Sequence, residues 1–104
     1  MPLRRRRVLA RNPRSEGLRA RLVEEWRQPR EDVPEPIIVE ESGPNKPTHL
    51  FVIWSDWGDF NQQERSEIIM DAYEEARGSD LVSLVTVAMG LTPTEAERMG
   101  IEYE

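Results

Sequence analysis

The chain has 104 residues, of which 38% are hydrophobic and 33% charged, with a formal net charge of −6 and no cysteine. This length and composition predict one folded domain with a modest core, and they exclude disulfides, thiolate chemistry and a membrane-spanning apolar segment. The basic start, residues 1–8, is not followed by the apolar segment of a secretory signal, so we expect a soluble cytoplasmic protein.

Charge is divided unevenly along the chain. Residues 1–30 carry ten arginines and three acids, a net charge of +7, whereas residues 31–104 carry four cations and seventeen acids, a net charge of −13. Such asymmetry is typical of a basic arm that binds nucleic acid or a membrane surface. It is equally typical of an arm that folds onto the acidic body of its own chain.

The first segments in chain order are a tail and a helix. Residues 1–13 are rich in arginine and poor in apolar groups, so we predict a flexible Arg-rich tail followed by a single domain over residues 14–104. Residues 15–28 show the apolar spacing of an amphipathic helix, with Ser15 as its N-cap. The expected apolar stripe consists of Leu18, Leu22, Val23 and Trp26.

A hairpin is predicted next. Residues 37–39 form a short apolar run, and residues 42–47 combine Ser, Gly, Pro, Asn and Lys in the pattern of a turn. The run over residues 49–57 is rich in β-branched and aromatic side chains, which is typical of a strand covered on both faces. The length of the turn predicts that these two strands lie antiparallel.

A strand–helix–strand unit organises the rest of the chain. Asn61 and Glu64 stand at the spacing of a capping box, and apolar side chains then recur at helical spacing, so we predict a helix over residues 61–77. A second apolar run over residues 81–89 predicts another strand. Because a crossover of this kind leaves its two strands parallel, we expect this strand to pair in parallel with the preceding one.

A short helix is predicted near the end of the chain. Thr92 stands at the N-cap, Pro93 occupies the first helical position, and Glu95 follows three residues after the cap. We expect Ala96 and Met99 to face inward. The predicted order is α-β-β-α-β-α, an α+β (α/β two-layer) fold with a three-stranded mixed sheet packed against helices.

Local features of the region His49–Ala96 resemble a known family. These features are a strand that opens with His49, Arg65 near the start of the following helix, and the helix start over Thr92–Glu95. In this respect the chain resembles the BolA-like proteins, whose fold is similar to the type II KH domain. That family places a histidine beside the arginine and uses it with glutaredoxin partners and iron–sulfur clusters. Here Ser66 occupies the position, so the ligand role is not carried over and no cofactor is expected.

The loop after the first long strand is the main candidate for a partner-binding site. It lies at the end of a predicted central strand, where open α/β sheets place their sites. If its aromatic side chains are exposed they mark a partner surface, and if buried they close the end of the core. Its acids could bind a hard cation through oxygen, but their spacing does not match a calcium loop. The candidate residues are Trp54, Trp57, Phe60, Asp56 and Asp59.

Other polar residues suggest alternatives. His49 could act as a ligand or general base, but it lacks the further histidine or cysteine that a zinc site requires, so a structural or surface role is the alternative. An enzyme would need His49, Asp56 and Asp59 to converge. Arg65 could bind an anion or pair with a nearby acid such as Asp59. No nucleophile motif or phosphate loop is present, so we predict no catalytic residue and no metal.

Two charged segments could make contacts. The acidic side of the helix over residues 61–77 could attract the Arg-rich N-terminal region, in the same chain or in another copy. The arginines of the tail could bind nucleic-acid phosphates, although the acidic body would repel a nucleic-acid backbone. The acids are Glu67, Asp71, Glu74 and Glu75, and the candidate nucleic-acid residues are Arg4, Arg5, Arg6 and Arg7.

Together these features predict a non-catalytic small α/β module that binds another protein or associates with itself, without a cofactor, metal or membrane contact. A nucleic-acid-contacting protein that uses the Arg-rich arm is the alternative.

Overall fold

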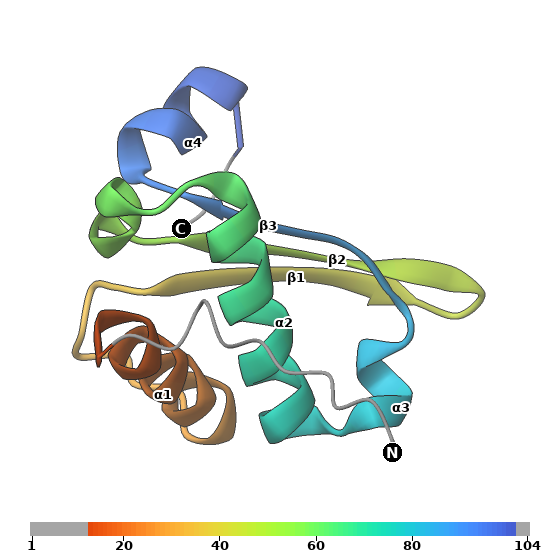
Figure 1. The fold of residues 1–104 in the computed structure, drawn as a ribbon. Helices are drawn as coiled ribbons and strands as arrows, with labels where there is room; N and C mark the ends of the chain where they lie inside the picture. Colours follow the sequence, from red (N-terminus) through yellow and green to blue (C-terminus); the bar gives the residue numbers. More distant parts are fainter. Residues whose placement is uncertain (1–12, 102–104) are drawn as a thin grey trace, which may run out of the picture.

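The computed structural model describes residues 13–101 of the chain. The fold is α+β, and the predicted order of helix, two strands, helix, strand and helix is confirmed (Figure 1). The elements are α1 (Pro13–Arg27), β1 (Ile37–Gly43), β2 (Lys46–Ile53), η2 (Ser55–Asp59), α2 (Gln62–Arg77), α3 (Ser79–Val82), β3 (Val85–Leu91) and α4 (Pro93–Met99).

The sheet has three strands in the order β1-β2-β3. β1 and β2 run antiparallel, and β2 and β3 run parallel, so both predicted pairings are confirmed. The strands reach further into the hairpin than predicted, because only Pro44 and Asn45 separate them. Asn45 has a φ of 62°, a left-handed conformation that asparagine tolerates in turns.

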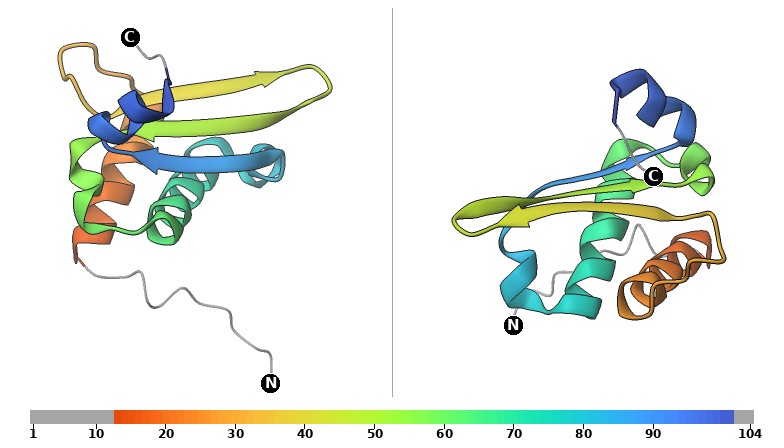
Figure 2. Two further views of the ribbon diagram at one scale, coloured as in Figure 1. Left: turned by 90° about the horizontal axis from the view of Figure 1, so that it is seen from above. Right: turned by 180° about the vertical axis from the view of Figure 1, so that it is seen from behind.

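The two faces of the sheet are covered unequally. Alternate side chains of β2 point to opposite sides, so Leu50 and Val52 face α1 and α2, whereas Phe51 and Ile53 face α4. Figure 2 shows α1 and α2 side by side on one face, and α4 alone over one end of the other. The β1–β2 hairpin extends beyond both layers.

The main core lies between the sheet and the helix pair α1–α2. Trp26 and Tyr73 meet edge-to-face across the two helices, with ring centroids 5.2 Å apart. The Tyr73 hydroxyl donates to Glu40 on β1 over 3.0 Å, so its polar end is also satisfied. The other buried members on these elements are Leu22, Val23, Leu50, Val52, Ile68, Ile69 and Ala72.

Both predicted capping boxes are present. Asn61 accepts from the Glu64 amide, and the Glu64 side chain accepts from the Asn61 amide. Thr92 and Glu95 make the same reciprocal bonds at the start of α4. These bonds satisfy amides that the first helical turn leaves unpaired, which explains why both helix starts could be read from local sequence.

The predicted strand over residues 49–57 is too long at its C-terminal end. β2 ends at Ile53, and the chain turns into η2. The Trp57 indole donates to the carbonyl of Val52 over 3.0 Å and its ring is fully buried. Burying this large side chain under the sheet requires the backbone to turn back, so the apolar run does not continue as a strand.

The predicted strand over residues 81–89 begins too early. Residues Ser79–Val82 form the single turn α3, and β3 starts only at Val85. The Ser83 hydroxyl donates to the carbonyl of Asp80 over 2.7 Å, a local bond that competes with strand formation. Periodicity alone does not separate a short buried strand from a helical turn.

Two smaller predictions are wrong, and a third concerns residues that the structure does not describe. α1 begins at Pro13, so Ser15 is a buried residue inside the helix and not its N-cap. Met99 does not face inward, since 53% of it is exposed. The predicted tail falls outside the described residues except for Pro13.

A substitution at Gly90 tests the packing of β3 against η2 and α2. An added Cβ would lie 2.8 Å from Trp57 Cε2 and 2.9 Å from Arg65 Cβ, so these groups would have to move. We expect Gly90→Ala to lower the free energy of unfolding by about 1–3 kcal/mol in urea titrations. Gly58→Ala is the control, because a Cβ there meets nothing within 4 Å. Equal effects of the two substitutions would contradict the packing argument.

Candidate functional site

The three aromatic candidates belong to the core. Exposed fractions are 6% for Trp54, 0% for Trp57 and 8% for Phe60. Their rings meet edge-to-face, with centroids 5.4 Å apart for Trp54–Trp57 and 6.2 Å for Trp57–Phe60. The interpretation as an exposed aromatic patch is therefore wrong, and the alternative, that these rings close the end of the core, is confirmed.

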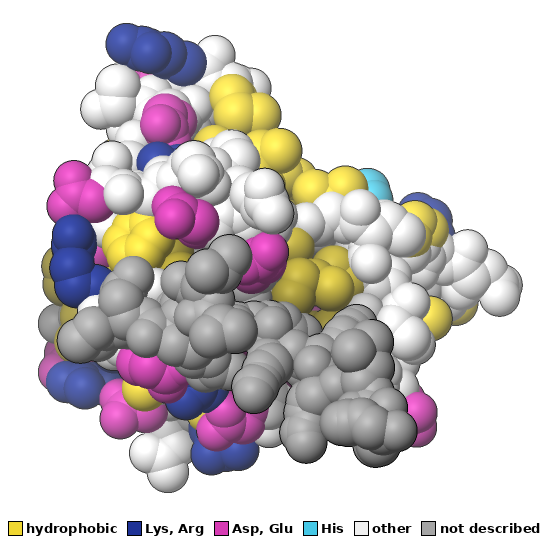
Figure 3. Space-filling model, viewed as in Figure 1, with side chains coloured by type: hydrophobic (Ala, Val, Ile, Leu, Met, Phe, Trp, Pro, Cys, Tyr) yellow, Lys and Arg dark blue, Asp and Glu magenta, His cyan; other side chains and the backbone are white. Residues whose placement is uncertain are grey.

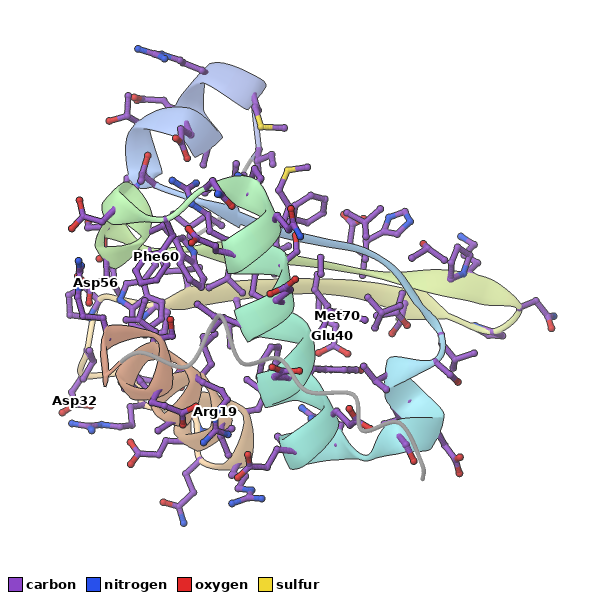
Figure 4. All side chains as sticks on the ribbon, in the orientation of Figure 1. Arg19, Asp32, Glu40, Asp56, Phe60 and Met70 are labelled. Carbon is purple, nitrogen blue, oxygen red and sulfur yellow. The ribbon has the colours of Figure 1, made fainter. Side chains whose placement is uncertain are left out.

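The two acidic candidates are exposed and do not form a cation site. Asp59 accepts from the Arg14 guanidinium over 2.7 Å, and that guanidinium also lies over the Phe60 ring at 5.3 Å. Figure 4 shows Asp56 and Phe60 at the η2 end of the molecule. Among residues 13–101, no group of three or more His, Cys, Asp or Glu could hold a metal ion.

His49 lies on β2 away from these acids. It stands opposite Glu41 on β1, with 3.6 Å between His49 Nδ1 and Glu41 Oε1. It lies four positions before Ile53, the last residue of β2, and this separation is roughly 13 Å at the rise of a strand. The convergence of His49, Asp56 and Asp59 that an enzyme would require is therefore not found. A hollow of about 470 Å³ beside the hairpin is lined by Glu40, Glu41, Ser42, Lys46, Pro47 and His49.

α1 contacts the acidic side of α2 through its arginines. Arg19, which Figure 4 labels on α1, pairs with Glu75. Arg27 donates to the Glu75 carbonyl over 3.2 Å. Arg21 pairs with Glu25 within α1 over 2.9 Å. The arginines of α1 therefore bind acceptors within the same chain. The nucleic-acid candidates Arg4, Arg5, Arg6 and Arg7 lie outside the described residues.

Arg65 is buried, and it pairs with an acid as predicted, although this acid is Glu95 and not Asp59. Its side chain is 7% exposed and pairs with Glu95 of α4, with 2.8 Å between Nη1 and Oε1. Nε donates to the Phe60 carbonyl over 2.8 Å, and Nη1 donates to the Gly90 carbonyl over 3.0 Å. A buried cation needs such partners, because its hydration is lost. One side chain thus joins α2, the η2 loop, β3 and α4.

Side chains of α2 also close the outer edge of β3. Gln62 Nε2 donates to the Gly90 carbonyl over 2.6 Å, and the Ser66 hydroxyl donates to the Ala88 carbonyl over 2.6 Å. Together with Arg65, these residues occupy acceptors that an added strand would use. These bonds discourage the pairing of a further strand with β3 at Ala88 and Gly90.

The α4 side of the sheet, by contrast, is largely open. Its side chains stand in three rows across the strands, and α4 packs over the row nearest to it through Ala96. The row under α4 is Ile37, Ile53 and Leu91, the middle row is Val39, Phe51 and Met89, and the hairpin row is Glu41, His49 and Val87.

We call the middle and hairpin rows the open face. Its four apolar side chains, Val39, Phe51, Val87 and Met89, are only partly buried. Figure 3 shows hydrophobic side chains running from α4 towards the histidine. A groove of about 350 Å³ continues this surface between β3 and α4, and its lining is Gln62, Met89, Leu91, Glu95, Arg98 and Met99. Sequence reasoning missed this surface, although the strands carry apolar residues on both faces and few helices were predicted.

Comparison with family models, with curated proteins and with solved structures found no match. The resemblance to the BolA-like proteins therefore stays a prediction. Over residues 13–101, no helix is both long enough and apolar enough to cross a membrane.

The buried arginine allows a prediction about stability. Arg65→Met keeps the apolar stem but removes the donor to the Phe60 carbonyl and one of the two donors to the Gly90 carbonyl, so we expect a loss of roughly 3 kcal/mol in the free energy of unfolding. Glu95→Gln keeps an acceptor for the guanidinium on a side chain that is 40% exposed, and should cost about 1 kcal/mol. Urea titrations measure both, and the reverse order would contradict the assigned contacts.

Acid should weaken the same contact. The Thr92 amide, followed by the Arg65 side chain, lowers the pKa of Glu95 below its ordinary value of 4.5. Because the folded pKa is depressed, the stabilisation is complete above pH 4.5 and is lost as the pH falls through the folded pKa. We expect the difference in unfolding free energy between the parent and Glu95→Gln to shrink from pH 7 to pH 3. Glu97→Gln, an exposed change on the same helix, should show no such narrowing.

Proposed function

We propose that this chain is a non-catalytic protein-binding module whose contact surface is the open face of the sheet. The observation that carries the proposal is a sheet surface with four partly exposed apolar side chains, Val39, Phe51, Val87 and Met89, beside the exposed Met99. A contiguous apolar surface of this kind is typical of interaction sites. The groove between β3 and α4 extends it.

The two edges of the sheet are less suited to binding a partner than the open face. The outer edge of β3 is capped by Gln62, Arg65 and Ser66. The outer edge of β1 carries exposed Glu40 and Glu41, and charged edge strands discourage pairing.

A photoreactive side chain at Phe51 tests the proposal. The full chain with benzoylphenylalanine in place of Phe51 is purified and irradiated, both alone and in a lysate of the organism of origin. Phe51 is partly exposed at the centre of the open face, so we expect one discrete adduct with a defined polypeptide. Mass spectrometry should map the crosslink to residue 51, and excess unlabelled parent chain should compete with it.

Two controls make the test specific. Benzoylphenylalanine at Leu84, which is 52% exposed but lies before β3 and away from the open face, should give no adduct. Unlabelled Met89→Asp chain should compete poorly, because the substitution places a charge in the middle row. The absence of an adduct at residue 51, or equal adducts at residues 51 and 84, would overturn the proposal.

A further inference from the structure

We infer that α4 is a lid on the sheet, which opens as a unit while the sheet, α1 and α2 stay folded. Opening uncovers the row of Ile37, Ile53 and Leu91 beneath α4, and so extends the open face from two rows of side chains to three. The use of this larger surface by a partner rests on the proposed function, whereas the opening itself can be measured without a partner.

The first argument is that the buried side chains form two separate clusters. The main core lies between the sheet and the helix pair α1–α2, and no residue of α4 belongs to it. The buried residue of α4, Ala96, packs with Ile53 and Leu91 in a small cluster on the other face of the sheet (Figure 2). Because the two clusters share no side chain, losing the contacts under α4 leaves the packing of the main core in place.

The second argument is that the chain is anchored directly before α4. The Trp54 amide donates to the Leu91 carbonyl over 2.8 Å, so the end of β3 stays bound to the segment that follows β2. The bonds between Thr92 and Glu95 lie within the lid itself. The chain can therefore leave the sheet at Thr92 without separating β3 from β2.

The third argument concerns the polar link between α4 and the rest of the fold. Among residues 13–101, the ion pair of Glu95 with Arg65 is the side-chain bond that ties α4 to another element. When α4 leaves, Arg65 keeps its bonds to the carbonyls of Phe60 and Gly90. The departure of α4 also admits water to the guanidinium, so that opening does not leave a buried cation without a partner.

The length of α4 makes the opening measurable. α4 has seven residues, and an isolated helix of this length is not stable in water. Detachment from the sheet therefore also breaks the hydrogen bonds of the Ala96 amide to the Thr92 carbonyl and of the Ile101 amide to the Ala96 carbonyl. Hydrogen exchange at the Ala96 and Ile101 amides, which we call the lid amides, thus reports the opening.

Native-state hydrogen exchange of the purified full chain tests the lid. NMR follows the two lid amides and, as a reporter of the main core, the amide of Ala72 in α2. After correction for intrinsic rates, we expect the lid amides to exchange about 100-fold faster or more than the Ala72 amide. Low concentrations of urea should accelerate exchange at Ala72 more than at the lid amides, because opening of the lid exposes less surface than global unfolding does.

Two substitutions on opposite faces of the sheet separate the two kinds of opening. Ile69→Val removes one methylene from the main core, which stays packed when the lid opens. It should accelerate exchange at Ala72 about threefold or more and leave the lid amides unchanged. Glu95→Gln weakens a contact that is lost in both kinds of opening, so it should accelerate exchange about fivefold at the lid amides and at Ala72 alike.

The outcomes distinguish this inference from the proposed function. Lid amides that exchange as slowly as Ala72, or that respond to Ile69→Val by the same factor as Ala72, overturn the lid. Fast, independent exchange of the lid amides supports the lid even when no crosslink forms at residue 51, a result that overturns only the proposed function. A crosslink at residue 51 together with lid amides that follow Ala72 overturns only the lid.

Discussion

The buried guanidinium of Arg65 is the contact on which the arrangement of the other elements depends. Its bonds reach the carbonyls of Phe60 and Gly90 and the carboxylate of Glu95. A cation removed from water is tolerated only when such partners are held in place, so the contact constrains the η2 loop, β3 and α4 together. The close approach of Trp57 and Arg65 to Gly90 leaves no room for a larger residue there. Polar bonding and packing thus select the same relative placement of these elements.

This arrangement decides which parts of the sheet remain available. The first turns of α2 supply Gln62, Arg65 and Ser66, which cap the carbonyls on the outer edge of β3. Since α1 and α2 both pack on one face, the other face receives only α4. Besides the outer edge of β1, the part of the sheet that stays accessible is therefore the open face. Recognition by such a surface depends on shape and apolar contact more than on backbone hydrogen bonds.

Local sequence patterns predicted those features of the fold that bonds between nearby residues stabilise. The capping boxes at Asn61 and Thr92 involve residues three apart, and both were read correctly. The ends of the strands were predicted poorly, because an apolar run also fits the turn that buries Trp57. The pairing of Arg65 with Glu95 spans 30 residues and leaves no trace in spacing. The open face could not be predicted from local sequence. It exists because the strands carry apolar side chains on both faces of the sheet, whereas the two long helices cover only one face.

The length of α4 explains why the face stays open. α4 has seven residues and is about 10 Å long, whereas the eight residues of β2 span roughly 26 Å. One such helix does not cover the whole face, so the apolar side chains of the middle row pack against its cluster and remain partly exposed. Removing each Å² of exposed apolar surface from water lowers the free energy by about 25 cal/mol, so covering this surface is favourable. The main core lies on the other side of the sheet, whereas Phe51 packs against the smaller cluster of Ile53, Leu91 and Ala96 and stays partly exposed.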